Sequence, residues 1–300
     1  MIIRNTVSSR PLRAIIYGPD GVGKSTFCAD SKGAVFIPTE DGLVNIDARA
    51  VDKVSSWAEL IDSVKFLAKE SSCETIVIDA LDGAERLCWS AVCERGNGKG
   101  AVASIESFGY GAGFTAALEM WSSLVHVLDR SNKSVLLIAH SERKTVKNPT
   151  GEDYDSIQIK LHAKAASMLR EWVDVVGFAE FRYSVSGDKN AKKAVGSGKR
   201  VLRTGANPSY SSKSRFDIPA CISLEWPLFE SEVEKSRVRT VEDLKLMAVA
   251  KIAEIEASEV REAANKYLSS AAPSKDLYRR CIESAVRHIE KQVQSNEVGV

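Results

Sequence analysis

The chain has 300 residues, 44% of them hydrophobic and 27% charged, and its formal net charge is +1. This is an ordinary globular composition, sufficient for one large core with a small appendage. The balanced charge excludes a protein that binds polyanions through its bulk charge, so any nucleic-acid contact must come from local patches. The sequence shows no secretory signal pattern and no apolar run of membrane-spanning length, so we expect a soluble, cytoplasmic protein without a membrane partner.

The first half of the chain alternates apolar runs with helical patterns. Buried strands are predicted at 13–17, 34–37, 74–79 and 134–139, and the segments after the first three carry apolar residues at helical spacing. Because each strand is a continuous apolar run, the pattern predicts an α/β fold. Its mainly parallel sheet would be covered by helices on both faces.

The second half of the chain has a different pattern. It is polar and turn-rich over 141–158, and strands predicted at 173–183 and 199–204 bracket a Gly/Lys-rich tip. The last part of the chain is helical. We therefore expect a core domain over residues 1–231 and a helical C-terminal extension over 232–300.

A glycine-rich loop follows the first strand. Residues 18–25 match G-x-x-x-x-G-K-[ST] at every fixed position, between a strand and a helix start. The glycines let backbone N–H groups turn toward a β-phosphate, and the helix N-terminus adds partial positive charge. Lys24 would reach the β- and γ-phosphates, and Ser25 would offer its hydroxyl to Mg²⁺. The pattern predicts ATP and Mg²⁺ as ligands, with a nucleotide-binding set of Gly18, Pro19, Asp20, Gly21, Val22, Gly23, Lys24, Ser25 and Thr26.

Asp79 ends an apolar strand, which is the Walker B arrangement. Its carboxylate is expected to face Mg²⁺ through a water molecule. The next residue is Ala80 rather than Glu, so a base that orients the attacking water must come from elsewhere. Glu40 is the first candidate, because a neighbouring parallel strand would bring it to the P-loop edge of the sheet, and Asp82 is the reserve candidate.

His140 ends the strand predicted at 134–139. A polar side chain at this position would lie beside the γ-phosphate, where it could report the phosphate to the segment that follows. We therefore predict a sensor role for His140.

These pieces, in this order, resemble the core of RecA-type recombinases. The strand ending in Glu40 looks like the one that carries the catalytic glutamate in that family. The strands ending in Asp79 and His140 look like its Walker B strand and its γ-phosphate sensor strand, although Gln is more usual at the sensor. The chain is more similar still to phage AAA-type nucleotide-binding proteins, including Sak-type single-strand annealing ATPases, over about residues 10–230. The similar stretches outside the P-loop are 138–143, 151–155, 160–162, 169–174 and 213–215.

The resemblance implies a RecA-like ATPase that binds or anneals single-stranded DNA in phage recombination, in the host cytoplasm. It implies a homo-oligomer, ring or filament, with ATP between subunits and a basic residue at the γ-phosphate. Lys213 and Arg215 are the candidates for that residue, in cis or in trans. A single-stranded-DNA-binding protein is a further candidate partner.

Three segments are candidates for DNA contact. Segments 97–113 and 141–160 are irregular, follow nucleotide-contacting elements and combine basic with aromatic residues. The tip at 189–193, with Lys199 and Arg200, is the most basic stretch. No sequence-reading motif is visible, so contact would be with the DNA backbone and tolerant of sequence.

Two other functions fit a P-loop. One is a nucleotide-switched loader or interaction ATPase of phage replication, which the absence of Glu after Asp79 disfavours. The other is a small-molecule kinase, which is disfavoured because no arginine-bearing lid is evident.

Overall fold

The computed structural model of the protein describes residues 10–98, 100–186, 193–237, 241–255, 258–270 and 275–298. The chain forms two compact units, one over Ser9–Val233 and one over the C-terminal part from Glu234. The domain boundary predicted between 231 and 232 lies within helix α6 (Trp226–Arg237).

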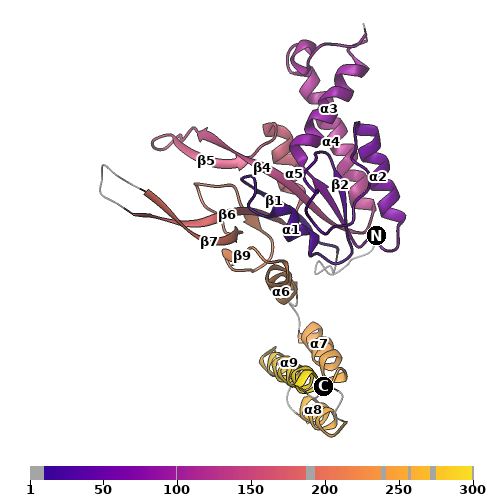
Figure 1. The fold of residues 1–300 in the computed structure, drawn as a ribbon, viewed down its shortest axis with the longest axis vertical. Coiled ribbons are helices and arrows are strands. Elements are labelled where there is room, and N and C mark those ends of the chain that lie inside the picture. Colours follow the sequence, from indigo (N-terminus) through magenta and orange to yellow (C-terminus); the bar gives the residue numbers. More distant parts are fainter. Residues whose placement is uncertain are drawn as a thin grey trace. The chain divides into compact units, whose positions relative to one another are not determined.

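One mixed sheet forms the centre of the larger unit (Figure 1). Its strands are β1 (Arg13–Gly18), β2 (Ala34–Pro38), β3 (Thr75–Asp79), β4 (Ser134–Val146), β5 (Tyr154–Ile159), β6 (Val175–Ser186), β7 (Lys193–Arg203), β8 (Lys213–Ser214) and β9 (Cys221–Ser223). The strand order is β2-β3-β4-β1-β6-β7-β9, with β5 beside β4 and β8 beside β6. Strands β2, β3, β4, β1 and β6 run parallel, so their carboxyl ends share one edge.

Helices cover both faces of this sheet. On one face lie α2 (Trp57–Lys69), α3 (Leu81–Arg95), α4 (Ala112–Arg130) and α5 (Ala163–Trp172). On the other face lie α1 (Lys24–Ala29) and α6. The predicted fold class, a mainly parallel α/β sheet between helices with a helical C-terminal region, is confirmed.

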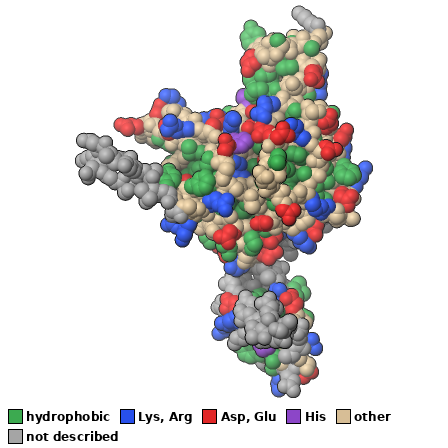
Figure 2. Space-filling model, in the orientation of Figure 1, with side chains coloured by type: hydrophobic (Ala, Val, Ile, Leu, Met, Phe, Trp, Pro, Cys, Tyr) green, Lys and Arg blue, Asp and Glu red, His purple; other side chains and the backbone are tan. Residues whose placement is uncertain are grey.

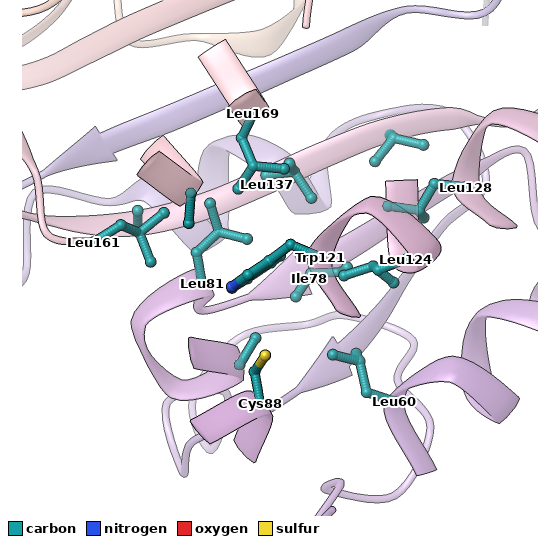
Figure 3. Close-up of a cluster of buried hydrophobic side chains, with 14 of the residues drawn as sticks. Leu60, Ile78, Leu81, Cys88, Trp121, Leu124, Leu128, Leu137, Leu161 and Leu169 are labelled. Carbon is teal, nitrogen blue, oxygen red and sulfur yellow. The ribbon is translucent and has the colours of Figure 1, made fainter. Parts of the chain in front are cut away.

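The larger core lies beneath α2–α5 (Figure 3). The buried Trp121 of α4 is at its centre, with Ile78 of β3 and Cys88 of α3 beside it. Its ring meets that of Trp57 edge-on, with centroids 5.2 Å apart. Helix α2 begins beside this contact because the Ser56 side chain accepts a hydrogen bond from the N–H of Glu59. The core thus fixes β3 and β4, whose carboxyl ends carry Asp79 and His140.

Two segments differ from their sequence-based predictions. Residues 141–158, expected to be irregular, continue β4 to Val146 and return as β5, forming an antiparallel hairpin. Charged and polar residues alternate with few apolar ones here, so hydrophobic periodicity gave no strand signal. Strand β6 also extends past the sheet and pairs with β7, so both hairpins project from the carboxyl edge of the parallel strands (Figure 1). Helix α6 begins at Trp226, before the helical extension that was predicted from residue 232.

The C-terminal unit contains α7 (Val241–Ala253), α8 (Ser258–Ser270) and α9 (Lys275–Val298). Ala248 packs against Leu277 and Cys281, and Ile252 packs against Ala285. Apolar residues at helical spacing therefore form the interior of this unit, as in other small helical domains. In the part of the chain that the structure describes, no helix is both long and apolar enough to cross a bilayer.

Candidate active site

The loop between β1 and α1 is shaped by its glycines. Gly21 and Gly23 have φ values of 69° and 99°, which other residues rarely adopt. Gly18 lies so close to β6 that an added Cβ atom would be 2.2 Å from the carbonyl oxygen of Ala179. Gly18 and Gly23, the two fixed glycines of the sequence pattern, thus occupy positions where the backbone favours glycine.

Lys24 lies buried inside this loop. Its Nζ donates hydrogen bonds to the carbonyl oxygens of Gly18 and Pro19, at 3.0 and 2.9 Å. Burial lowers the pKa of Lys24, against the opposing effect of Asp20 and Asp79. The ammonium group borders a cavity of about 350 Å³, a volume typical of small-ligand sites.

Ser25 and Asp79 are in contact at the wall of this cavity. The Ser25 hydroxyl donates a 2.6 Å hydrogen bond to an oxygen of the Asp79 carboxylate. Burial raises the pKa of Asp79, because it disfavours the charged carboxylate. A cation bound beside Asp79 would oppose this effect and stabilise the ionised form. A hydroxyl and a carboxylate oxygen at this spacing are the hard donors that Mg²⁺ prefers, and the predicted metal residues therefore fit the ion.

Glu40 lies at the same cavity. It comes two residues after Pro38, which pairs with Asp79 across the parallel β2 and β3, so both carboxylates reach one edge of the sheet. The Glu40 carboxylate accepts a 2.6 Å hydrogen bond from the Arg86 guanidinium on α3. The candidate base therefore lies beside the P-loop in an ion pair with the exposed Arg86.

His140 lies between two carboxylates. Its Nδ1 is 2.9 Å from Asp82 Oδ1, and its Nε2 is 3.2 Å from Asp20 Oδ1 in the P-loop. The hydrogen bond with Asp82 raises the pKa of His140. Burial alone would raise the pKa of Asp82, but the hydrogen bonds and charge of His140 outweigh burial and lower it. Because β4 lies between β1 and β3, the imidazole lies between the P-loop and Asp79.

Glu40, Asp82 and His140 offer ligand atoms within 4.8 Å of one another. Cations already balance the carboxylates, since Arg86 pairs with Glu40 and Lys160 Nζ lies 3.8 Å from Asp82. Both nitrogens of His140 already face carboxylates, Nδ1 that of Asp82 and Nε2 that of Asp20. This set therefore fits an ion-pair network better than a resident metal. Asp82, the reserve candidate for the base, is thus in contact with His140.

Comparison with known proteins identifies the domain around this cavity. The family described as AAA domain matches residues 10–216, most of the chain. The chain belongs to the AAA domain family. Its P-loop and Asp79 both lie in the matched region, and membership confirms the predicted nucleotide-binding domain of the NTPase class. One similar solved structure is described as the RadB recombinase, at 14% identity and a TM-score of 0.36, covering 65% of this chain and 80% of that one. No curated protein matches the chain.

Lys213 and Arg215 lie at the other edge of the AAA domain's sheet. Strand β8 pairs with the start of β6, whereas the P-loop follows the end of the parallel β1. Arg215 pairs with Asp174 at 3.2 Å. The structure does not bring Lys213 or Arg215 to the P-loop of their own chain. Contact with the γ-phosphate of a neighbouring subunit, in trans, stays a prediction.

Arg200 of β7 lines the cavity, which the sequence did not predict. Its Nη1 lies 3.5 Å from the carbonyl oxygen of Val22. Sequence reasoning assigned Arg200 to the basic tip. Arg200 lies at the P-loop because the β6–β7 register places it opposite Phe181. No local sequence pattern predicts that register.

The candidate DNA segments have different surfaces. Basic residues of the β4–β5 hairpin are paired with acids: Lys144 with Glu142, Arg143 with Asp155 and Lys147 with Asp153. On the face of the AAA domain that Figure 2 shows, acidic and basic side chains are interspersed. On the β6–β7 hairpin, Phe181 and Tyr183 are 42% and 60% exposed.

Two predicted DNA-contacting groups cannot be compared with this surface. Lys99 and most of the basic tip, residues 187–192, lie outside the described residues. Within segment 97–113, Tyr110 is fully exposed on a turn with φ of 46°. Exposed aromatic rings therefore occur both just before α4 and on the β6–β7 hairpin.

Proposed function

We propose that the protein is a RecA-like AAA-domain ATPase that hydrolyses ATP with Mg²⁺ and binds or anneals single-stranded DNA in phage recombination. One observation carries the hydrolytic part of this proposal. A single cavity is lined by Lys24, Ser25, Asp79, Glu40 and His140. It combines a lysine that can bind phosphate, oxygen donors for Mg²⁺, a carboxylate that can act as a base, and an imidazole whose pKa is raised.

In this proposal Glu40 accepts the proton of the water that attacks the γ-phosphate. Arg86 acts as a positioning residue, because its 2.6 Å contact holds the Glu40 carboxylate toward the cavity. When bound, Mg²⁺ neutralises charge that develops on the phosphate oxygens. Lys24 adds positive charge at the phosphates, and His140 adds to it when it is protonated.

His140 serves as the γ-phosphate sensor in this proposal. Its Nε2 contacts Asp20, an exposed P-loop carboxylate, and a γ-phosphate would compete with that carboxylate for the imidazolium. The same strand continues from His140 into the β4–β5 hairpin. A displacement of His140 on nucleotide binding would therefore be transmitted to the β4–β5 hairpin along the backbone of β4.

The proposed enzyme acts as a homo-oligomer. Lys213 and Arg215 lie away from the P-loop of their own chain, so either would reach ATP only from a neighbouring subunit. A cation supplied in this way stabilises transition-state charge and couples turnover to assembly. A single-stranded-DNA-binding protein is a further proposed partner.

The proposed DNA contact lies on the β6–β7 hairpin. Exposed Phe181 and Tyr183 offer faces on which bases can stack. The β4–β5 hairpin is a weaker candidate, because acids within it neutralise its basic residues. Contact of this kind depends on stacking and backbone charge, and therefore tolerates any sequence.

ATP hydrolysis measured with and without single-stranded DNA tests the proposal. We expect the DNA to stimulate hydrolysis by the wild type, and Lys24→Ala to abolish the stimulated rate. Turnover indifferent to DNA, with no DNA binding by anisotropy at low salt, would instead favour a nucleotide-switched loader. Phosphoryl transfer to a nucleoside would overturn the proposal in favour of a kinase.

A further inference from the structure

Two basic side chains, His140 and Arg200, flank the P-loop from opposite sides of β1. His140 belongs to β4, which pairs with one edge of β1. Arg200 belongs to β7, which lies beyond β6 on the other edge. The side with β4 also carries Asp79 and Glu40, the candidate groups for Mg²⁺ and water. With these assignments, the γ-phosphate end of a bound nucleotide would lie toward β4 and the α-phosphate end toward β7.

The Arg200 guanidinium lies against the second half of the P-loop. Its Nη1 is 3.5 Å from the carbonyl oxygen of Val22. A Cβ atom on Gly23 would be 2.5 Å from the same nitrogen, so the guanidinium lies directly against the P-loop backbone. Within the described part of the chain, no ion pair joins Arg200 to a carboxylate, and its long contact with Val22 is a weak hydrogen bond. The charge of Arg200 is therefore available to a ligand of the cavity that it lines.

We propose that Arg200 binds the α- and β-phosphates of the nucleotide from within the same chain. The second half of a P-loop cradles these phosphates, and a planar guanidinium donates two parallel hydrogen bonds to phosphate oxygens. A change of rotamer in this exposed side chain exchanges the Val22 carbonyl for such an oxygen. The inference rests on nucleotide binding at the P-loop and adds a ligand outside the P-loop motif.

A contact between Arg200 and phosphate would connect the nucleotide to the β6–β7 hairpin. Arg200 pairs with Phe181 across the β6–β7 hairpin, and its carbonyl oxygen accepts a hydrogen bond from Leu224 near β9. A bound phosphate chain would therefore join the P-loop to the hairpin that we propose for DNA contact. Nucleotide should then slow amide hydrogen exchange in β7 near Arg200.

The test compares ADP and ATP binding to the full chain by wild type, Arg200→Ala, Arg200→Lys and the control Arg182→Ala. Arg182 lies on the neighbouring strand of the same hairpin, is exposed and does not line the cavity. We expect Arg200→Ala to weaken ADP and ATP about 3- to 10-fold and equally, because it removes a partly solvated charge-assisted contact. Arg200→Lys should recover part of the loss, and Arg182→Ala should bind as the wild type does.

Unchanged ADP affinity in Arg200→Ala would overturn the proposal, as would a loss confined to ATP, which would move the contact to the γ-phosphate. Equal losses in Arg200→Ala and Arg182→Ala would also overturn it, because they indicate a general effect of hairpin charge. Hydrogen exchange in 200–203 gives a second readout: ADP should slow it in the wild type and not in Arg200→Ala. Failure of nucleotide binding itself would appear in the wild type, and so is distinguishable from failure at Arg200.

Discussion

The Ser25 hydroxyl donates a 2.6 Å hydrogen bond to the Asp79 carboxylate, although the two residues are 54 positions apart. This contact joins the P-loop to β3 and sets both oxygen donors on one side of the cavity. The two oxygen atoms would bind Mg²⁺ at this point of the nucleotide site. Loss of the Asp79 carboxylate should therefore reduce Mg²⁺-dependent hydrolysis.

Replacing Asp79 by Asn should lower Mg²⁺-dependent ATP hydrolysis by about 100-fold or more, since removing one group that stabilises transition-state charge has effects of that size. Nucleotide binding in EDTA should persist, because Lys24 and the loop backbone remain. The control Asp62→Asn removes an exposed carboxylate of α2 that pairs with Lys65, and it should leave turnover unchanged. Equal hydrolysis by Asp79→Asn and the wild type would contradict the metal assignment.

Replacing Glu40 by Gln should reduce hydrolysis by about 10²–10⁴-fold, the usual contribution of a general base, while ATP affinity is retained. Single-turnover kinetics with a parallel binding titration would measure both quantities. Asp41→Asn is the matched control, since Asp41 is the adjacent acid and pairs with exposed Lys53 rather than lining the cavity. A Glu40→Gln variant that turns over normally would discard Glu40 as the base.

The Asp82–His140 pair should stabilise the fold in a defined pH window. The pKa of His140 is raised above 6.5, so its contribution is complete below pH 6.5 and is lost as pH rises through the folded pKa. The pKa of Asp82 is lowered below 3.8, so its contribution is present above that pH and is lost as pH falls through the folded pKa. Stabilisation by the pair is therefore greatest between about pH 4 and 6.5.

A double-mutant cycle with Asp82→Asn and His140→Gln would measure this coupling by chemical denaturation. We expect about 1–2 kcal/mol at pH 5.5, as for a partly buried charged hydrogen bond, and clearly less at pH 8.5. A coupling free energy that is equal at both pH values, or larger at pH 8.5, would show that His140 is not charged in the folded protein.

Gly18→Ala should lower the free energy of unfolding by about 1–3 kcal/mol, the usual cost of overpacking, because the new Cβ atom would meet the Ala179 carbonyl oxygen. The closest control is Gly42→Ala, where an added Cβ atom has no neighbour within 4 Å. Thermal unfolding of both variants would measure the difference. Similar melting temperatures would contradict the close approach of β1 and β6.

Local sequence patterns predicted the parts of this site that follow strand ends. The apolar runs before Glu40, Asp79 and His140 predicted parallel strands, and parallel strands bring such residues to one edge. The pairing of His140 with Asp82 was not predicted, because 58 residues separate them and strand order decides their contact. The β4–β5 hairpin was missed because its strands lack alternating apolar residues.

The sequence analysis placed Arg200 in a basic tip proposed for DNA contact, because long-range strand pairing is not visible in the sequence. Its neighbours in sequence are basic and glycine-rich, a pattern typical of an exposed tip. The β6–β7 register is a long-range property that brings this residue to the P-loop. The location of Lys213 and Arg215 also depends on long-range pairing, since β8 joins the start of β6.

Isothermal titration of the full chain with MgATP tests the nucleotide site most directly. The wild type should bind one nucleotide per chain, and Lys24→Ala should bind about 10- to 100-fold more weakly, the equivalent of a lost charged hydrogen bond. Lys32→Ala, at an exposed lysine that pairs with Glu74, should bind as the wild type does. Equal affinity of the wild type and Lys24→Ala, or no binding by either, would contradict nucleotide binding at this P-loop.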